Sequence, residues 1–120
     1  MKILIIDDES NCLFILQHKL GNVFPNSKIV SSNKGKEALE IISKEKNFDL
    51  LITDIRMPEV DGYKIAKHFK AENKLAKVIA STALDPKSIK NSLAKNFDGF
   101  IQKPWKDFDK QLLEILKDSN

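Results

Sequence analysis

The sequence predicts an α/β fold: a five-stranded parallel sheet flanked by five helices, with strand and helix alternating along the chain. Five short apolar runs of strand length recur through the 120 residues, and the intervals between them carry apolar residues at helical spacing. Alternating strands and helices form a parallel sheet with right-handed crossovers. The length is that of one domain, so we expect a single domain covering residues 1–120.

The strands are predicted from runs of apolar and β-branched residues. The first, third and fourth runs read KILII, DLLIT and KVIAS and are apolar almost throughout. Strands with both faces covered by helices have this composition, because neither face meets water. The five predicted strands are Lys2–Ile6, Lys28–Ser31, Asp49–Thr53, Lys77–Ser81 and Gly99–Gln102.

Each predicted strand is followed by apolar residues three or four apart, the spacing of one helix face. Three helix starts also carry capping signals, at Ser10, Asp61-Gly62 and Asp85-Pro86. The predicted apolar faces are Leu13, Leu16 and Leu20; Ala38, Leu39 and Ile42; Ile65, Ala66 and Phe69; Ile89 and Leu93; and Phe108, Leu112 and Ile115.

Composition excludes several classes of protein. The chain is 42% hydrophobic and 31% charged, a balance typical of folded domains rather than disordered ones. No apolar run reaches membrane-spanning length, and acidic residues directly follow the first strand where a signal peptide would continue. Cys12 is the only cysteine, which excludes an internal disulfide and a thiolate zinc cluster. We therefore expect a cytoplasmic protein with no membrane partner.

The charge pattern argues against nucleic-acid binding. The net charge of +3 alone would permit it. However, Arg56 is the only arginine among 20 basic residues, and no basic run or zinc-finger pattern is present. We interpret the lysines as a solvated surface and expect no direct contact with nucleic acid.

Polar residues occur where four of the predicted strands end. Asp7 and Asp8 follow the first strand and Asp54 follows the third. Thr82 follows the fourth strand and Lys103 the fifth. The carboxyl ends of parallel strands meet at one edge, where ligands bind at the point of reversed strand order. If the first and third strands are neighbours, three carboxylates meet there.

These residue types suit phosphoryl transfer onto a carboxylate. Carboxylates that lie close together repel one another, and a Mg²⁺ ion with oxygen ligands relieves this repulsion. Lys103 adds a cation suited to a phosphoryl anion, and Thr82 adds a hydroxyl that can bond to it. Each residue alone is more often a cap or turn residue. Their ordered occurrence at successive strand ends favours aspartyl-phosphate chemistry.

The sequence resembles the receiver domain of two-component response regulators along nearly its whole length. The segments that carry the resemblance are ILIIDDE, DLLITDIRMPEVDG, VIASTA and DGFIQKPW, in the family's order. The pattern D-x-x-M-P-x-x-D-G is the most specific of them. The resemblance implies a flavodoxin-like sheet with strand order 2-1-3-4-5. It also implies a signalling switch that catalyses only its own phosphorylation and dephosphorylation, and not a turnover enzyme.

The resemblance assigns a role to each site residue. Asp54 matches the phosphoacceptor, which takes a phosphoryl group from the phosphohistidine of a sensor kinase or phosphotransfer protein. Asp8, Asp54 and the backbone carbonyl of Arg56 match direct Mg²⁺ ligands. Asp7 matches the acid that holds the metal through water, and Lys103 matches the lysine that pairs with the phosphoryl oxygens.

The implied switch involves Thr82 and Phe100. Thr82 matches the hydroxyl that moves to bond the phosphoryl group, and Phe100 matches the aromatic residue that turns inward behind it. The face of the fourth helix, fifth strand and fifth helix is expected to respond. It would control a downstream protein or an attached output domain, as a monomer or as a phosphorylation-dependent homodimer. The Lys103–Pro104 bond is expected to be cis.

Some residues depart from the family's usual pattern. The interval from Thr82 to Lys103 is slightly short, and Asn96-Phe97 stands where Gly-Ala is common. The size of Phe97 predicts altered packing near the switch. Arg56 and Leu84 occupy variable positions beside the site, where shielding by both side chains predicts slow loss of the phosphoryl group.

We interpret Trp105 as packing on the fifth helix, with an exposed docking residue as the alternative. Two enzyme classes fit less well. A phosphatase with an aspartate nucleophile needs D-x-D after the first strand, where Glu9 stands instead. A flavin-type redox protein needs a phosphate loop there, which Asp7, Asp8 and Glu9 would repel. An atypical receiver that acts only as a docking module is the remaining alternative, and the complete set of site residues argues against it.

Overall fold

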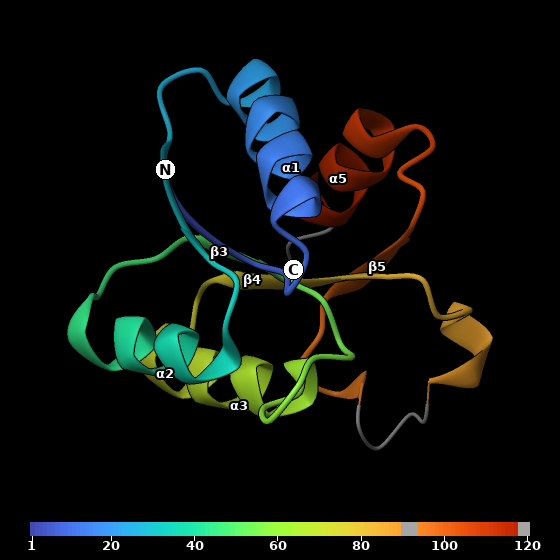
Figure 1. Cartoon of the computed structure of the whole chain (residues 1–120). Coiled ribbons are helices and arrows are strands. Elements are labelled where there is room, and N and C mark those ends of the chain that lie inside the picture. The colour runs from blue at the N-terminus through green and yellow to red at the C-terminus, as the bar shows by residue number, and fades with distance from the viewer. Residues whose placement is uncertain (90–93, 118–120) are drawn as a thin grey trace.

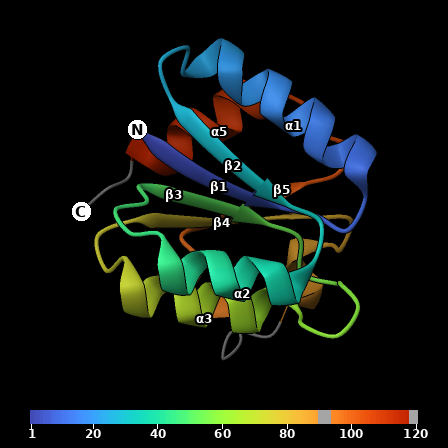
Figure 2. The same ribbon diagram turned by 60° about the vertical axis from the view of Figure 1, so that its left-hand side comes forward.

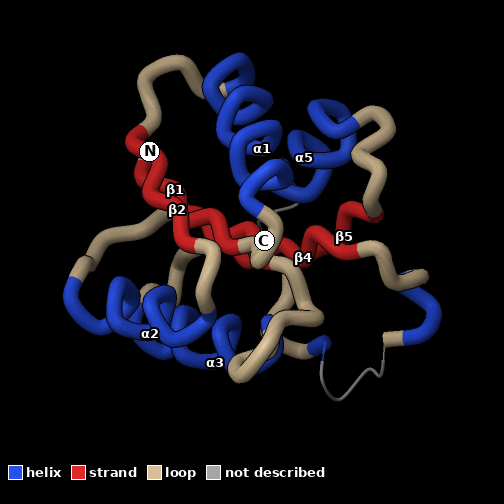
Figure 3. Tube along the Cα trace, in the orientation of Figure 1, coloured by secondary structure: helices blue, strands red, loops and turns tan. Residues whose placement is uncertain are grey.

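The computed structural model arranges the chain in three layers, with a central sheet between two pairs of helices (Figures 1 and 3). It describes residues 1–89 and 94–117. The sheet is parallel throughout with strand order β2-β1-β3-β4-β5, as the resemblance implies. The strands are β1 (Lys2–Ile6), β2 (Lys28–Ser32), β3 (Leu50–Thr53), β4 (Lys77–Thr82) and β5 (Gly99–Gln102).

Helices cover both faces of the sheet. Helices α1 and α5 lie together on one face, and α2 and α3 lie together on the other (Figure 2). Their bounds are α1 (Ser10–Val23), α2 (Gly35–Lys44), α3 (Gly62–Glu72) and α5 (Phe108–Lys117).

The continuous apolar runs of the strands supply two cores at once, because successive side chains of a strand point to opposite faces. In β1, Ile3 and Ile5 pack beneath α1 and α5. Leu4 and Ile6 pack against α2 and α3. The predicted helix faces are confirmed as buried at Leu13, Leu16, Leu20, Ala38, Ile42, Ile65, Ala66, Phe69, Ile89, Phe108 and Leu112, with Leu39 and Ile115 half-buried.

Two helix starts differ in how well the capping signal places them. Asp61 caps α3 as predicted, with its Oδ1 accepting a hydrogen bond from the Lys64 amide at 3.0 Å. At α1 the cap is Glu9, one residue before the predicted Ser10, which is already helical. The chain turns earlier because the Glu9 amide donates to Asp7 Oδ1 at 2.9 Å directly after the strand.

The predicted fourth helix lies partly outside the described residues. A 3₁₀ turn, η1 (Pro86–Ser88), begins at the Asp85-Pro86 signal. Asp85 accepts hydrogen bonds from the amides of Lys87 and Ser88, through its side chain and its carbonyl respectively. Leu93, predicted on the same helix face as Ile89, lies outside the described residues. Four α-helices and this turn lie wholly within the described residues.

Among residues 1–89 and 94–117, no helix has both the length and the apolar character needed to span a bilayer.

Candidate functional site

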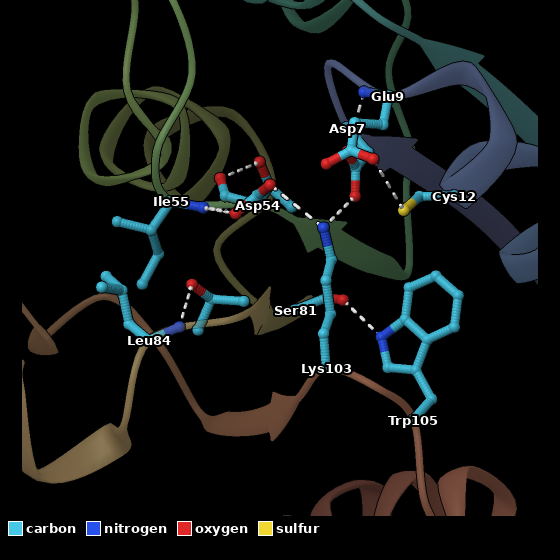
Figure 4. A network of polar contacts seen from close by, with 11 residues as sticks. Asp7, Glu9, Cys12, Asp54, Ile55, Ser81, Leu84, Lys103 and Trp105 are labelled. Atoms are coloured by element: carbon cyan, nitrogen blue, oxygen red, sulfur yellow. Dashed lines mark hydrogen bonds and ion pairs between the residues drawn. The ribbon is translucent and has the colours of Figure 1, made fainter.

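Acidic side chains from two neighbouring strand ends meet at one edge of the sheet (Figure 4). Strand β1 pairs with both β2 and β3, so the strand order reverses beside β1. Oxygens of Asp7, Asp8 and Asp54 all lie within 4.8 Å of one another. Asp7 and Asp54 are buried and Asp8 is exposed. The predicted meeting of three carboxylates is therefore confirmed.

Lys103 joins this cluster from the segment after β5. Its Nζ lies 2.6 Å from Asp7 Oδ2 and 3.1 Å from Asp54 Oδ2, so one ammonium bridges two carboxylates (Figure 4). Burial alone would lower the pKa of Lys103, but its hydrogen bond to Asp7 and the charge of Asp54 raise the pKa well above its ordinary value. Lys103 is thus a permanent cation at neutral pH.

Asp54 sits in an environment that disfavours its charge. Burial raises the pKa of the Asp54 carboxyl, while the charge and hydrogen bond of Lys103 oppose that rise; the net pKa lies above the ordinary value. Asp54 Oδ1 accepts a hydrogen bond from the Ile55 amide at 2.7 Å. The second oxygen, Oδ2, faces Lys103. A further cation at this edge would favour the ionised carboxylate.

Gly62 allows helix α3 to begin directly behind Asp54. A Cβ at position 62 would lie 2.2 Å from the carbonyl oxygen of Asp54 and 2.8 Å from Cα of Ile55. The Gly62 amide donates to the Ile55 carbonyl at 2.8 Å. The Asp61-Gly62 pair therefore caps the helix and permits this close approach. The sequence signal indicated only the cap.

Thr82, the last residue of β4, is buried beside Lys103. The Lys103 amide donates to the Thr82 carbonyl at 2.8 Å. The Thr82 Oγ1 accepts a hydrogen bond from the Leu84 amide at 3.1 Å. The hydroxyl is thus held by its own loop and keeps its proton free to donate.

A family model of the response regulator receiver domain matches residues 3–117. The chain belongs to this family. The receiver is therefore the phosphorylation-based signalling module of a two-component response regulator, with Asp7, Asp8 and Asp54 as its acidic phosphorylation site. Receivers are signalling modules, and their chemistry is limited to their own phosphorylation. The resemblance to a receiver, and the signalling role that it implies, are thus confirmed.

Curated relatives of the receiver include plant regulators. It is 31% identical over 105 residues to two-component response regulator ARR12 of Arabidopsis thaliana. It is 36% identical over 90 residues to ARR2 of the same plant. The alignments cover 87% and 74% of this chain but 17% and 13% of those relatives. The chain thus spans less than a fifth of the length of the two regulators.

Solved structures share the fold over nearly the full chain. Response regulator TrrA from Thermotoga maritima, solved in complex with Mg(2+)-BeF, is 27% identical with a TM-score of 0.79. The match covers 95% of this chain and 97% of TrrA. A CheY-like receiver domain from Methylobacillus flagellatus has a TM-score of 0.82 at 20% identity, covering 100% of this chain and 98% of that one.

Phe100 of the receiver lies in a row of three aromatic rings. Its ring centroid is 5.4 Å from that of Phe97, and Phe97 is 5.9 Å from Tyr63 in an edge-on contact. Phe100 is half-buried and packs with Ala80 and Ile89. The three rings connect β5 to the start of α3 through Phe97.

Two hollows flank the acidic cluster of the receiver. One, of about 630 Å³, is lined in part by Arg56, Leu84 and Tyr63. The other, of about 580 Å³, is lined by Asp8 and residues of the segments before α2 and α3. Arg56 is exposed and Leu84 half-buried. Solvent therefore reaches the site from the side of Asp8.

The sequence did not indicate a hydrogen bond between Trp105 and Ser81. Trp105 Nε1 donates to Ser81 Oγ at 2.7 Å (Figure 4). The ring also contacts Phe108 edge-on at 6.2 Å between centroids, which confirms that Trp105 packs on α5. The peptide bond from Lys103 to Pro104 is cis, as expected. No spacing or composition signal links two single residues on separate strand ends.

Proposed function

We propose that the receiver is a phosphorylation-activated switch in which Asp54 accepts a phosphoryl group from the phosphohistidine of a sensor kinase or phosphotransfer protein. The observation that carries this proposal is the Lys103 ammonium, 3.1 Å from Asp54 Oδ2 within a cluster of three carboxylates. A nucleophilic carboxylate beside a fixed cation is suited to attack phosphorus, because the cation also attracts the incoming phosphoryl oxygens.

In the proposed step, an Asp54 carboxylate oxygen attacks the phosphorus of the N-phosphorylated imidazole. A P–O bond forms as the P–N bond breaks, and the imidazole leaves with the electron pair and takes a proton from water. Lys103 then bonds to the phosphoryl oxygens, which replace Asp54 Oδ2 as its partner. The Thr82 hydroxyl donates its proton to the same group.

Asp7, Asp8 and Asp54 offer hard oxygen ligands that suit Mg²⁺. We propose that Asp8, Asp54 and the carbonyl of Arg56 bind the ion directly and that Asp7 binds it through water. The exposure of Asp8 beside the hollow of about 580 Å³ leaves room for a hydrated ion to enter. When bound, Mg²⁺ neutralises charge between the carboxylates and the phosphoryl oxygens. TrrA, solved with Mg(2+)-BeF, supports this choice of metal.

The proposed output follows from the new charge at Asp54. Thr82 and Lys103 move toward the phosphoryl group, and Phe100 follows Thr82 inward. The face of β5, α5 and the segment between β4 and β5 then changes. We propose that this face controls a downstream protein or an attached output domain, as a monomer or as a phosphorylation-dependent homodimer. Residues 1–120 would act as one receiver domain.

The proposal is tested by intact-mass spectrometry after incubation with acetyl phosphate, with and without Mg²⁺. We expect a gain of one phosphoryl group that requires Mg²⁺ and is lost in Asp54→Asn. Asp109→Asn, which neutralises an exposed carboxylate on α5, is the matched control and keeps the gain. Phosphorylation of Asp54→Asn to the wild-type level would refute Asp54 as the acceptor.

A further inference from the structure

The hydrogen bond from Trp105 to Ser81 lies between the two strand ends that carry Thr82 and Lys103. Ser81 immediately precedes Thr82, and Trp105 stands two residues after Lys103. The bond, 2.7 Å between Nε1 and Oγ, spans from the segment after β5 to the end of β4. Figure 4 shows the indole nitrogen pointing toward the Ser81 hydroxyl.

Backbone hydrogen bonding alone does not continue this connection. The Lys103 amide donates to Thr82 at 2.8 Å, the last such bond along this strand pair in the described chain. Pro104 follows and has no amide proton to donate. The indole N–H of Trp105 therefore supplies the next hydrogen bond between the segment after β5 and β4.

Both partners of this hydrogen bond, Ser81 and Trp105, are held in place by their surroundings. Ser81 is 2% exposed, so its hydroxyl has little access to water as a replacement partner. The half-buried Trp105 ring packs edge-on against Phe108 and against the core beneath α1 and α5. An indole fixed by packing and by one hydrogen bond restricts the backbone on which Lys103 stands.

The Lys103 Nζ contacts Asp7 and Asp54 together, at 2.6 and 3.1 Å. Its side chain has four rotatable bonds and can place the ammonium in many positions. A fixed backbone at Lys103 narrows that range and favours the position beside Asp54.

We propose that Trp105 is a positioning residue for phosphoryl transfer. Its hydrogen bond to Ser81 holds the segment 103–105 against β4, and so keeps the Lys103 ammonium beside Asp54. The inference rests on the proposed function of Asp54 as phosphoacceptor. The indole itself touches no reacting group and acts through Lys103.

The test measures the rate of phosphorylation by acetyl phosphate at saturating Mg²⁺ in two variants. Trp105→Phe keeps an aromatic ring near Phe108 and removes the donor, and Ser81→Ala removes the acceptor. We expect each to slow the reaction roughly fivefold, the effect of one ordinary hydrogen bond, and the double variant to be no slower than either. In a Lys103→Ala background neither change should slow the reaction further.

Two further readouts separate positioning from a general loss of structure. Mg²⁺ affinity, measured by calorimetry, should not fall, because the carboxylates are intact and a displaced Lys103 ammonium competes less for them. The NMR signal of the Lys103 ammonium should be visible in the wild type and should broaden in Trp105→Phe as its protons exchange faster. Phe14→Ala, at an exposed position of α1, is the control for both.

The outcomes distinguish this inference from the proposed function. A wild type that gains no phosphoryl group from acetyl phosphate or from a phosphohistidine donor would refute the proposed function. An ammonium signal still broadened in the variants would then show that Trp105 holds Lys103 in place, but not for phosphoryl transfer. Normal rates and an unchanged signal in both variants would overturn the positioning role. The positioning role would also be overturned if Trp105→Phe and Ser81→Ala slowed phosphorylation as much in the Lys103→Ala background as in the wild type. A loss of Mg²⁺ affinity as large as the loss of rate would overturn it too.

Discussion

At the scale of single residues, the central contact of the receiver is the Lys103 ammonium between Asp7 and Asp54. Burial works against every one of these charges, and their mutual attraction offsets it. The pKa of Lys103 is raised, so the cation persists at all moderate pH values. The pKa of Asp54 is also raised, chiefly by burial, so its negative charge is held at a cost to stability. A cation bound at this edge of the sheet would offset that cost.

Asp54→Asn should therefore stabilise the receiver in the absence of Mg²⁺. A folded-state pKa above the unfolded value means that the folded state binds the proton more tightly, so the stability that Asp54 contributes falls as pH rises through 3.8 and above. The gain in the free energy of unfolding caused by Asp54→Asn should be small in acid, grow as pH rises from 3.8, and level off above the raised pKa of Asp54. Thermal unfolding of the wild type and of Asp54→Asn at a series of pH values measures this gain.

Asp109→Asn, on the exposed side of α5, is the control and should show no such trend. Each kcal/mol of stabilisation corresponds to a shift in Tm of about 4 °C in a domain of this size. An advantage that shrinks as pH rises would mean that burial does not dominate the environment of Asp54.

Single residues also mark how far sequence reasoning reaches. Asp7, Asp8, Asp54 and Lys103 were predicted together because parallel strands all end at one edge, and topology alone brings their residues together. The hydrogen bond of Trp105 to Ser81 could not be predicted. It depends on the direction of one side chain after a loop, which no periodicity in the sequence encodes.

At the scale of elements, the site depends on how closely helix α3 approaches the end of β3. Gly62 is the point of contact, since a Cβ there would lie 2.2 Å from the Asp54 carbonyl oxygen. The same turn places the Ile55 amide against Asp54 Oδ1. The position of the Asp54 carboxylate, the proposed nucleophile, is thus coupled to the packing of α3.

Gly62→Ala should lower the free energy of unfolding by about 1–3 kcal/mol, because the new methyl group meets backbone atoms that cannot move aside. It should also slow phosphorylation by acetyl phosphate, since α3 must shift away from Asp54. Urea unfolding and intact-mass kinetics provide the two measurements.

Gly21→Ala is a matched control, because nothing lies within 4 Å of a Cβ at position 21 in α1. It should stabilise the protein by about 0.5–1 kcal/mol, as alanine does in a helix interior. If both glycine variants changed stability in the same direction, the close approach at Gly62 would not explain its role.

Element by element, the sequence predicted most of this fold. The strands were found because runs buried on both faces are apolar throughout, and β1 and β5 have the predicted bounds. The start of α1 was wrong by one residue, because the Asp7 carboxylate turns the chain at Glu9 and overrides the Ser10 signal. Of the predicted fourth helix, the described residues show the turn η1 at its start, and Leu93 lies outside them.

At the scale of the whole molecule, the acidic cluster links metal binding to folding. Asp7, Asp8 and Asp54 come from segments far apart in sequence and meet only when the sheet has formed. A cation that binds this cluster therefore binds the folded state alone, and so stabilises it.

Mg²⁺ should raise the Tm of the wild-type receiver, and the rise should grow with the logarithm of its concentration. At 100 times the Kd the gain is about 2.7 kcal/mol. Asp8→Asn should remove most of this gain, while Asp109→Asn on α5 keeps it. An equal rise in Asp8→Asn would place the metal away from the acidic cluster.

The most direct test of the account is to locate the phosphoryl group itself. After phosphorylation from a phosphohistidine donor, borohydride reduces an aspartyl phosphate to homoserine, and peptide mass spectrometry identifies the reduced position. We expect homoserine at residue 54 and at no other acidic residue. Homoserine at position 7 or 8, or a phosphorylated protein in which Asp54 is not reduced, would show that Asp54 is not the acceptor.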